Sequence, residues 1–144
     1  MLKKSYVRAI SQIIRTGHWI TDMVTHELKE FDISEPQYNV LRILKYRRGQ
    51  PLTVQEIQDK MVQRSSNVTR LIDKLLDKGL VNRQECATNR RKMDISITQA
   101  GLDLLVRLEE KVYDLHQPMA GNLTPSEAET LSELIIKLKG NSQP

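Results

Sequence analysis

Residues 65–70 carry a dense group of polar side chains that could read the edges of DNA bases. The group consists of Ser65, Ser66, Asn67, Thr69 and Arg70. Asn67 could pair with N6 and N7 of adenine, and the Arg70 guanidinium could bind O6 and N7 of guanine with two N–H groups. A recognition helix presents its first turns to the major groove, where such contacts are made. The alternative is that the serines only cap a helix and that Arg70 is a solvated surface residue.

Arg90 and Arg91 form a second pair of side chains suited to nucleic acid. They end a polar, basic stretch, beginning at Cys86, that is predicted to form the tip of a β-hairpin. A narrow minor groove concentrates negative potential and attracts inserted arginine side chains. The pair therefore indicates a minor-groove contact made by the hairpin, and a merely soluble turn is the alternative.

The basic residues are distributed unevenly along the chain. The net charge is +4, but residues 60–92 hold nine basic and three acidic residues, so the rest of the chain carries a net charge of −2. A basic segment in a mildly acidic chain is typical of contact with a polyanion. An acidic protein partner is the alternative. RNA is disfavoured because only 4% of the residues are aromatic, and Trp19 and Phe31 lie outside the basic segment.

Other kinds of chemistry find little support in the residue pattern. There is no glycine-rich phosphate loop, no nucleophile elbow and no acidic pair with a catalytic context, so we expect neither an enzyme nor a cofactor. Asp22 and His26 stand one helical turn apart, but no cysteine or second histidine completes a metal site, and we expect no metal. Cys86, near Arg83 and Arg90, could sense oxidants. We interpret it as an ordinary strand or turn residue.

The apolar spacing and the capping patterns predict a chain of six helices. Their approximate ranges are 2–30, 34–46, 53–61, 65–78, 98–117 and 124–139. Ser34, Thr53 and Thr124 each stand three residues before Gln or Glu, which is the capping-box spacing. Gly79 supplies a left-handed stop for the fourth helix, and the fifth is expected to end before Pro118.

The third and fourth helices are separated by only three residues, 62–64, and therefore form a helix-turn-helix candidate. Two strands are predicted after them, at 80–85 and 92–98, joined by a tip at 86–91. Met93, Ile95 and Ile97 alternate with polar residues in the second strand. The predicted fold class is mainly α with a small β-hairpin wing, and the element order is that of a winged helix-turn-helix.

This region resembles the MarR (multiple antibiotic resistance regulator) family, and the resemblance covers nearly the whole chain. It is carried by SSNVTRLIDKL at 65–75, DKGLV at 77–81, NRR at 89–91 and ISIT at 95–98. The resemblance implies a DNA-binding transcription regulator, a repressor relieved by a small-molecule ligand, with its recognition helix in the major groove and its wing in the minor groove. The family pattern usually has Asp where this chain has Asn89.

The resemblance also implies how a single domain, 1–144, would be organised. Residues 34–98 would form the winged helix-turn-helix DNA-binding region, and residues 1–30 and 99–140 a helical dimerisation region of a homodimer. A phenolic or similar small-molecule effector would bind between the two regions, and double-stranded operator DNA would be the partner. The apolar stripes of the first, fifth and sixth helices fit a dimer, and packing within one chain is the alternative.

Composition and targeting patterns predict a cytoplasmic protein. No apolar stretch approaches the roughly 18 residues that would span a bilayer, so no membrane partner is expected. The residues after Met1 form no continuous apolar region of a signal peptide. Cys86 is the only cysteine, which excludes an intrachain disulfide and agrees with a reducing compartment.

Overall fold

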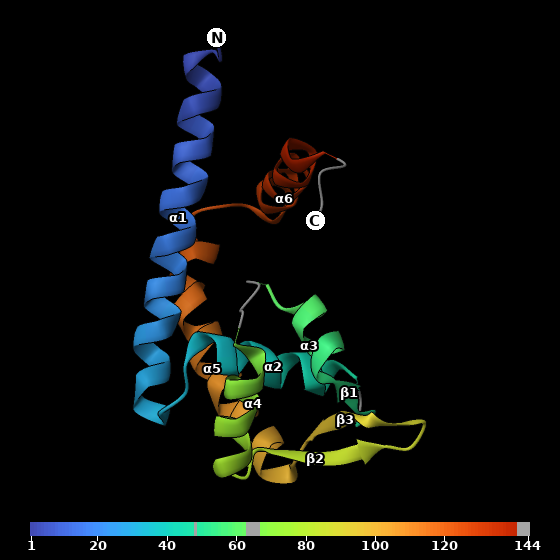
Figure 1. Cartoon of the computed structure of the whole chain (residues 1–144). Helices are drawn as coiled ribbons and strands as arrows, with labels where there is room; N and C mark the ends of the chain where they lie inside the picture. Colours follow the sequence, from blue (N-terminus) through green and yellow to red (C-terminus); the bar gives the residue numbers. More distant parts are fainter. Residues whose placement is uncertain (48, 63–66, 141–144) are drawn as a thin grey trace.

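The computed structural model describes residues 1–47, 49–62 and 67–140 (Figure 1). The helices are α1 (Lys4–Leu28), α2 (Glu35–Tyr46), α3 (Val54–Lys60), α4 (Val68–Asp77), α5 (Gln99–Ala120) and α6 (Pro125–Lys139), with a 3₁₀ turn η1 (Lys29–Phe31) after α1. The strands are β1 (Leu52–Thr53), β2 (Val81–Cys86) and β3 (Asn89–Ile97). The predicted fold class, mainly α with a small β-hairpin wing, is confirmed.

Three helices begin with the capping boxes that the sequence predicts. At the start of α2, the Ser34 hydroxyl accepts from the Gln37 amide at 3.3 Å, and the Gln37 side chain accepts from the Ser34 amide at 3.0 Å. The same reciprocal pair of bonds joins Thr53 with Glu56 before α3 and Thr124 with Glu127 before α6. Each pair satisfies backbone N–H groups that have no partner inside the helix.

The hydrophobic core is built around α2. Five consecutive residues of this helix, 37–41, are buried, so that α2 is covered on nearly all sides. The end of α1 and the first half of α5 pack against it through Leu28, Leu105 and Leu108, which have no exposed surface. No helix in the described part of the chain is long and apolar enough to cross a membrane.

The small sheet has three antiparallel strands in the order β1-β3-β2. The predicted hairpin is β2 and β3. The sequence analysis did not predict β1, which adds to the far edge of β3. Leu52 of β1 pairs with Ile95, and both side chains are buried. A strand of two residues is too short to show an alternating pattern, which is why the sequence did not reveal it.

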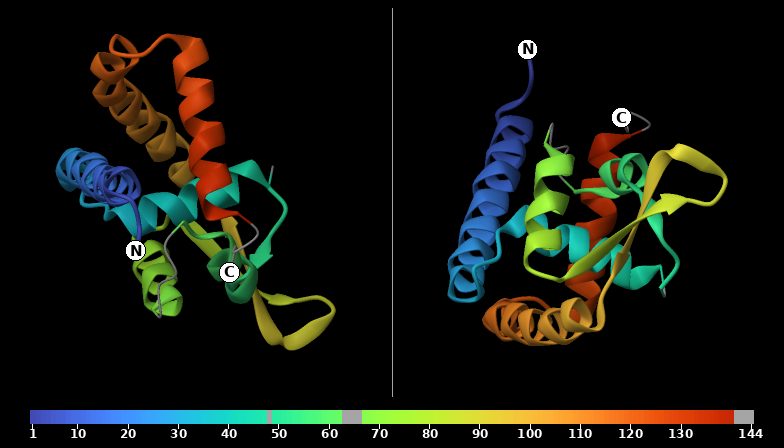
Figure 2. Two further views of the ribbon diagram at one scale, coloured as in Figure 1. Left: turned by 90° about the horizontal axis from the view of Figure 1, so that it is seen from above. Right: turned by 60° about the horizontal axis from the view of Figure 1, so that its bottom comes forward.

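The wing is longer and its tip shorter than predicted. Cys86 pairs with Asn89, so only residues 87 and 88 form the turn. The register then shifts from Asn89 to Met93, and residues 90–92 of β3 have no opposing residue on β2. Arg90 and Arg91 therefore lie in a bulged part of the strand rather than in the turn itself. Figure 2 shows the wing projecting away from the rest of the molecule on the side opposite α1.

Two helix ends differ from the sequence prediction. α5 continues through Pro118 to Ala120. Proline removes one N–H and crowds the carbonyl four residues earlier, and here both Pro118 and Asp114 are exposed, so the loss falls on the solvent side of the last turn. α1 ends at Leu28, earlier than predicted, and η1 completes the corner before Asp32 takes the left-handed conformation with φ 54°.

Candidate nucleic-acid interface

Helix α4 separates apolar from polar residues sharply. Val68, Ile72 and Leu75 are buried in the core, whereas Asn67, Thr69 and Arg70 are exposed. Three of the residues predicted to read DNA therefore lie together on the outward side of the first turns of α4. The other two, Ser65 and Ser66, lie outside the described residues.

The end of α4 is fixed to the beginning of α5. Gly79 takes φ +71°, and its amide donates to Leu76 at 2.9 Å while the Leu80 amide donates to Leu75 at 3.0 Å. These bonds form the left-handed helix end that Gly79 predicts. The Thr98 hydroxyl then donates to the Gly79 carbonyl at 2.7 Å, which ties the helix end to the N-cap of α5.

The connection before α4 is anchored by a buried polar residue, Asn39 of α2. Its side chain is only 9% exposed, and its Oδ1 accepts from the Val62 amide at 3.1 Å. Asn39 thus sets where the chain leaves α3 on its way to the recognition helix. Sequence reasoning missed it, because an isolated asparagine within an amphipathic helix reads as a surface residue.

The bulged part of the wing presents two arginine side chains that form no ion pair with a described residue. Arg90 and Arg91 are exposed, and the Asn89 side chain accepts from the Arg91 amide at 3.0 Å, holding the bulge in an Asx turn. Asn89 therefore shapes the wing by a local hydrogen bond. Between residues 1–47, 49–62 and 67–140, no ion pair involves Arg70, Arg90 or Arg91.

A different arginine ties the wing to α4. Arg83 of β2 donates to the Asp73 carboxylate at 3.2 Å, and both side chains are about half exposed. Arg83 is thereby neutralised, while the neighbouring cations of the wing remain available to an anion. Cys86, also in β2, is half-buried with its Sγ 3.3 Å from the Thr88 hydroxyl.

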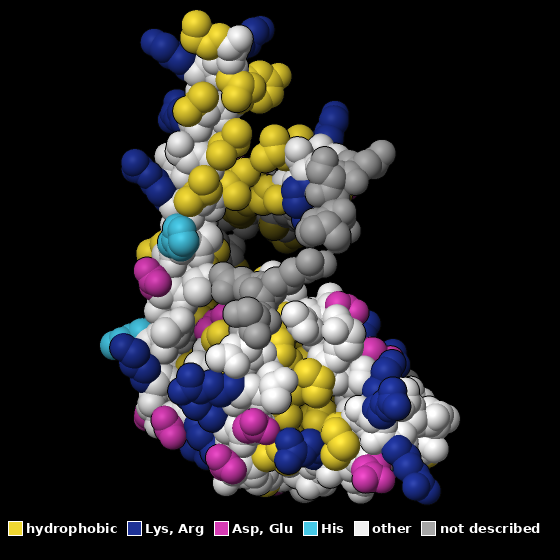
Figure 3. Space-filling model, viewed as in Figure 1, with side chains coloured by type: hydrophobic (Ala, Val, Ile, Leu, Met, Phe, Trp, Pro, Cys, Tyr) yellow, Lys and Arg dark blue, Asp and Glu magenta, His cyan; other side chains and the backbone are white. Residues whose placement is uncertain are grey.

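A hollow of about 300 Å³ lies between the start of α3 and the bulged part of β3. Arg91 and Lys92 line it from the wing, and Thr53 and Gln55 from the helix side. Nearby, the pKa of Glu56 is lowered, chiefly because the Thr53 backbone N–H donates to its carboxylate, with a smaller contribution from the positive charges of Arg47 and Lys92. Figure 3 shows Lys and Arg side chains gathered on the wing and beside the lower helices.

A family model described as the MarR family matches residues 33–93, the part of the chain from the start of α2 into the wing. Among solved structures, a MarR transcription factor from Planctomyces limnophilus is 33% identical, with a TM-score of 0.72, and the match covers 96% of this chain and 98% of that one.

Several similar structures contain DNA. Sco3205, a MarR family transcriptional regulator from Streptomyces coelicolor in complex with DNA, is 21% identical with a TM-score of 0.85, covering 100% of this chain and 95% of that one. A MarR mutant from E. coli complexed with operator DNA is 24% identical with a TM-score of 0.81, covering 96% of this chain and 98% of that one. At these identities the likeness is one of fold.

Proposed function

The chain belongs to the MarR family of transcription regulators, and from that premise we propose that it binds double-stranded DNA at specific sequences. The observation that carries the proposal is the division of α4 into a buried apolar side and an outward side bearing Asn67, Thr69 and Arg70. DNA in two structures of the same fold supports it. The regulator is expected to act in the cytoplasm.

In the proposed complex, α4 enters the major groove and the wing lies along the minor groove. Base edges are read by Asn67, Thr69 and Arg70 at the start of the helix, and by Ser65 and Ser66, which lie outside the described residues. Arg90 and Arg91 follow the narrow groove from the bulge of β3, where neither forms an ion pair with a described residue. Because bulges redirect side chains away from the sheet, the register shift supports this placement.

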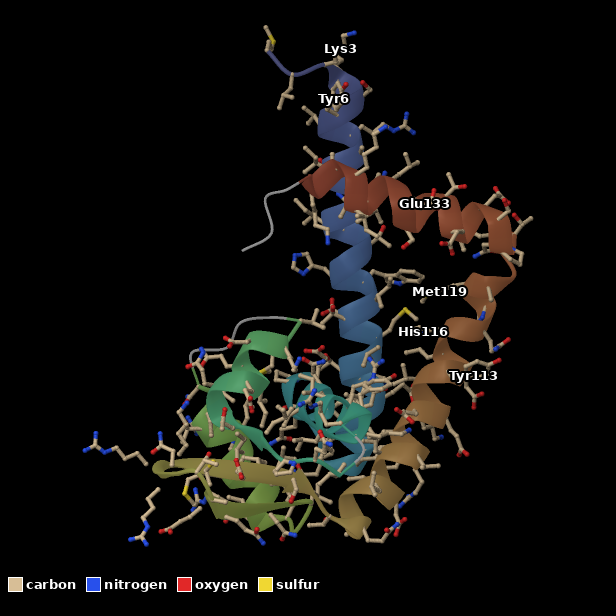
Figure 4. All side chains as sticks on the ribbon, turned by 90° about the vertical axis from the view of Figure 1, so that its right-hand side faces the viewer. Lys3, Tyr6, Tyr113, His116, Met119 and Glu133 are labelled. Carbon is tan, nitrogen blue, oxygen red and sulfur yellow. The ribbon has the colours of Figure 1, made fainter. Side chains whose placement is uncertain are left out.

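The terminal helices support the second part of the proposal, a homodimer. Every residue from 1 to 19 is exposed, and α6 has no buried residue in the described chain. Tyr6, Ile14, Leu134 and Ile136 are each more than half exposed. Figure 3 shows hydrophobic side chains gathered where α1 and α6 face each other, and Figure 4 shows Tyr6 on α1, Glu133 on α6 and Tyr113, His116 and Met119 on α5. Such apolar surface is characteristic of an interface.

A dimer also fits the way such helices read DNA, because two copies match the two half-sites of a symmetric operator. In the full proposal the protein is a repressor, and a phenolic or similar ligand relieves repression. Space for a small ligand supports the last step: hollows of about 570 and 460 Å³ lie at the junctions of α1 with α4 and of α2 with α5. Release of bound DNA by a panel of phenolic acids would test it.

Selection of duplex DNA from a random pool tests the sequence reading. The parent protein should enrich one symmetric motif, and Arg70→Ala should lose about 1 to 3 kcal/mol of binding free energy on it, with relaxed preference at one base pair in each half-site. Arg83→Ala is the control, because Arg83 is neutralised by Asp73. If no motif emerges, or if binding to random duplex is independent of salt, the basic surface serves an acidic protein partner instead.

The dimer is tested by Leu134→Asp, which puts a charge into the apolar surface of α6. At concentrations where the parent scatters light as a dimer, the variant should be monomeric, and its affinity for the selected DNA should fall by about two orders of magnitude or more because each winged unit alone makes half the contacts. A folded, dimeric variant with full DNA affinity would contradict the placement of the interface on α6.

A further inference from the structure

The end of α1 and the recognition helix α4 face each other across a hollow of about 570 Å³. Thr25 and Lys29 line it from α1 and η1, and Leu71 and Lys74 line it from α4. The two helices are therefore separated along much of their facing sides. Their relative position is set by the core that both helices share and by contacts at the edges of this hollow.

Lys78, at the C-cap of α4, makes such a connection. Its Nζ donates to the backbone carbonyl of Asp32 and lies 3.4 Å from the Asp32 carboxylate. Asp32 belongs to the corner between η1 and α2, 46 residues earlier in the chain. One side chain thus joins the end of the recognition helix to the end of α1.

The acceptor is held rigidly. Asp32 takes the left-handed conformation, its amide donates to Lys29 at 3.0 Å, and the next amide, of Ile33, donates to Leu28 at 3.3 Å. Ile33 is buried in the core. These bonds fix the direction of the Asp32 carbonyl, so that Lys78 is tied to a stationary point on the α1–α2 corner.

The donor is equally well placed. The Lys78 amide donates to Lys74 at 3.2 Å, and the chain then turns at Gly79, whose carbonyl accepts from the Thr98 hydroxyl. The same end of α4 is therefore held on one side by α5 and on the other by the α1–α2 corner. Arg70 stands two turns away toward the start of the helix, where a rotation about the Lys78 end would move the backbone most.

We propose that Lys78 is a positioning residue for DNA reading, which sets the angle of the recognition helix relative to α1 through Asp32. This inference rests on the proposed function. Ten residues of helix span about 15 Å, so a rotation of about 5° at the Lys78 end moves the start of α4 by about 1 Å. Because α1 carries the apolar surface that would meet a second copy, the same angle sets the spacing of two recognition helices on two half-sites.

The connection is suited to positioning rather than to holding the fold together. The Asp32 carboxylate is 96% exposed and the Lys78 side chain 30% exposed, and exposed ion pairs contribute little to stability. Removing the ammonium should leave the melting temperature and the dimer unchanged. A change in DNA binding would then report the position of α4 and not the amount of folded protein.

The test compares three variants on the DNA motif selected by the parent protein. Lys78→Met should weaken binding to that motif by about fivefold and leave binding to random duplex unchanged. A fivefold loss is the size expected for one exposed ion pair. Lys78→Arg, which keeps a donor, should stay within about twofold of the parent. Lys74→Met is the matched control: it removes the same charge from the same helix and the same hollow, but Lys74 has no ion pair with a described residue. Equal behaviour of Lys78→Met and Lys74→Met would overturn the proposal.

Salt dependence separates positioning from direct contact with DNA. If Lys78 bound a phosphate, Lys78→Met would flatten the salt slope by about one unit and weaken binding to every sequence. That result would overturn the proposal, and an unchanged slope is expected.

Asp32→Asn tests whether the affinity for DNA rises or falls when the partner of Lys78 loses its charge. Removing a negative charge from a protein that binds DNA should by itself raise affinity. We expect a small loss, about twofold, because the ammonium keeps the carbonyl but loses the carboxylate. A gain in affinity would overturn the inference. Arg70→Ala in the same assay separates the positioning role of Lys78 from the proposed reading of DNA by α4. If Arg70→Ala weakens binding to the selected motif and Lys78→Met does not, only the positioning role fails. If neither variant weakens binding to that motif, the proposed reading by α4 fails as well.

Discussion

The winged unit, which runs from α2 to the first half of α5, buries its apolar residues, whereas the terminal helices, the first half of α1 and all of α6, expose residues of the same kinds. Between α2 and the first half of α5, leucine and isoleucine side chains such as Leu41, Ile72 and Leu105 are fully buried within one chain. In the first half of α1 and in α6, most apolar side chains are exposed, and Ile14 and Leu134 are more than half exposed. The winged unit completes its own core, whereas the terminal helices present apolar surface that the described part of their own chain leaves uncovered.

This difference separates two sources of stability. Contacts inside one chain stabilise it at any concentration, whereas contacts between copies stabilise it only when the partner is present. The same substitution should therefore affect stability differently in the two regions. If its effect depends on protein concentration, it weakens contacts between copies, and if not, it weakens contacts within one chain.

The largest expected effect comes from Leu105→Ala. Leu105 has no exposed surface, so its truncation should lower the free energy of unfolding by about 2 to 5 kcal/mol. The loss should be the same at low and high protein concentration, as measured by urea denaturation.

Leu134→Ala is the matched change in α6, where the side chain is 56% exposed. It should alter stability only at concentrations where the parent is dimeric, with the dissociation constant of the dimer as the second measurement. A large loss at the lowest concentrations would mean that Leu134 is covered within its own chain, and the contrast between the regions would fail.

A smaller contrast is expected between two glycines. A Cβ at Gly101 would meet the Leu80 carbonyl oxygen and would stand 2.7 Å from Ile97 Cγ1, because the chain entering β2 crosses the first turn of α5 there. Gly101→Ala should therefore lower the free energy of unfolding by about 1 to 3 kcal/mol through overpacking.

At Gly17 of α1 a Cβ would have nothing within 4 Å in its own chain. Gly17→Ala should raise helix stability by about 0.5 to 1 kcal/mol, because alanine favours the helix. Thermal unfolding at low concentration measures both variants. A weaker dimer for Gly17→Ala, with the fold intact, would show that the partner approaches α1 closely at this position. An unchanged free energy of unfolding for Gly101→Ala would contradict the close contact between the chain entering β2 and the first turn of α5.

Asn39 should show an intermediate effect confined to the winged unit. Asn39→Ala removes the acceptor for the Val62 amide and should lower the free energy of unfolding by about 1 kcal/mol. Amide exchange at Val62 should become faster. Asn39→Asp keeps an oxygen acceptor and is the control. If Asn39→Ala leaves Val62 exchange as slow as in the parent, Asn39 does not hold the connection before α4.

The sequence predicted the parts of the fold that depend on local spacing. The capping boxes at Ser34, Thr53 and Thr124 specify backbone hydrogen bonds three residues away, and the glycine at 79 specifies a left-handed helix end. Both kinds of signal lie within one helical turn, so they can be read without knowing the fold. The family resemblance rested on equally local motifs in α4 and the wing.

The features that the sequence did not reveal depend on pairing between distant segments. β1 exists because Leu52 meets Ile95, and neither residue alone indicates that contact. The bulge that carries Arg90 arises from the register of two strands. Lys78 and Asp32 are 46 residues apart, and no local pattern connects them. The candidate DNA-reading residues could thus be named from the sequence, but the contacts that position them could not.

The smallest effect is expected when the two capping boxes that contain a glutamate, before α3 and before α6, are compared at acidic pH. The pKa values of Glu56 and Glu127 are both lowered below the ordinary value of 4.5, in each case chiefly by the backbone N–H of the capping threonine. A carboxyl group whose pKa is lower in the folded state stabilises the fold fully above its unfolded pKa. That stabilisation is lost as the pH falls below 4.5 through the lowered, folded value.

The same loss should have different consequences in the two regions. α3 remains anchored after protonation of Glu56, because Ile57 in the next position is fully buried. α6 has no buried residue, so its first turn depends more strongly on the bonds between Thr124 and Glu127. At protein concentrations low enough to dissociate the dimer, amide exchange at the start of α6 should therefore accelerate more, as the pH falls below 4.5, than exchange at the start of α3. Glu127→Gln keeps a neutral capping side chain and should remove the pH dependence at α6 alone, and equal acceleration at both helices in the parent would show that α6 is held by contacts within its own chain.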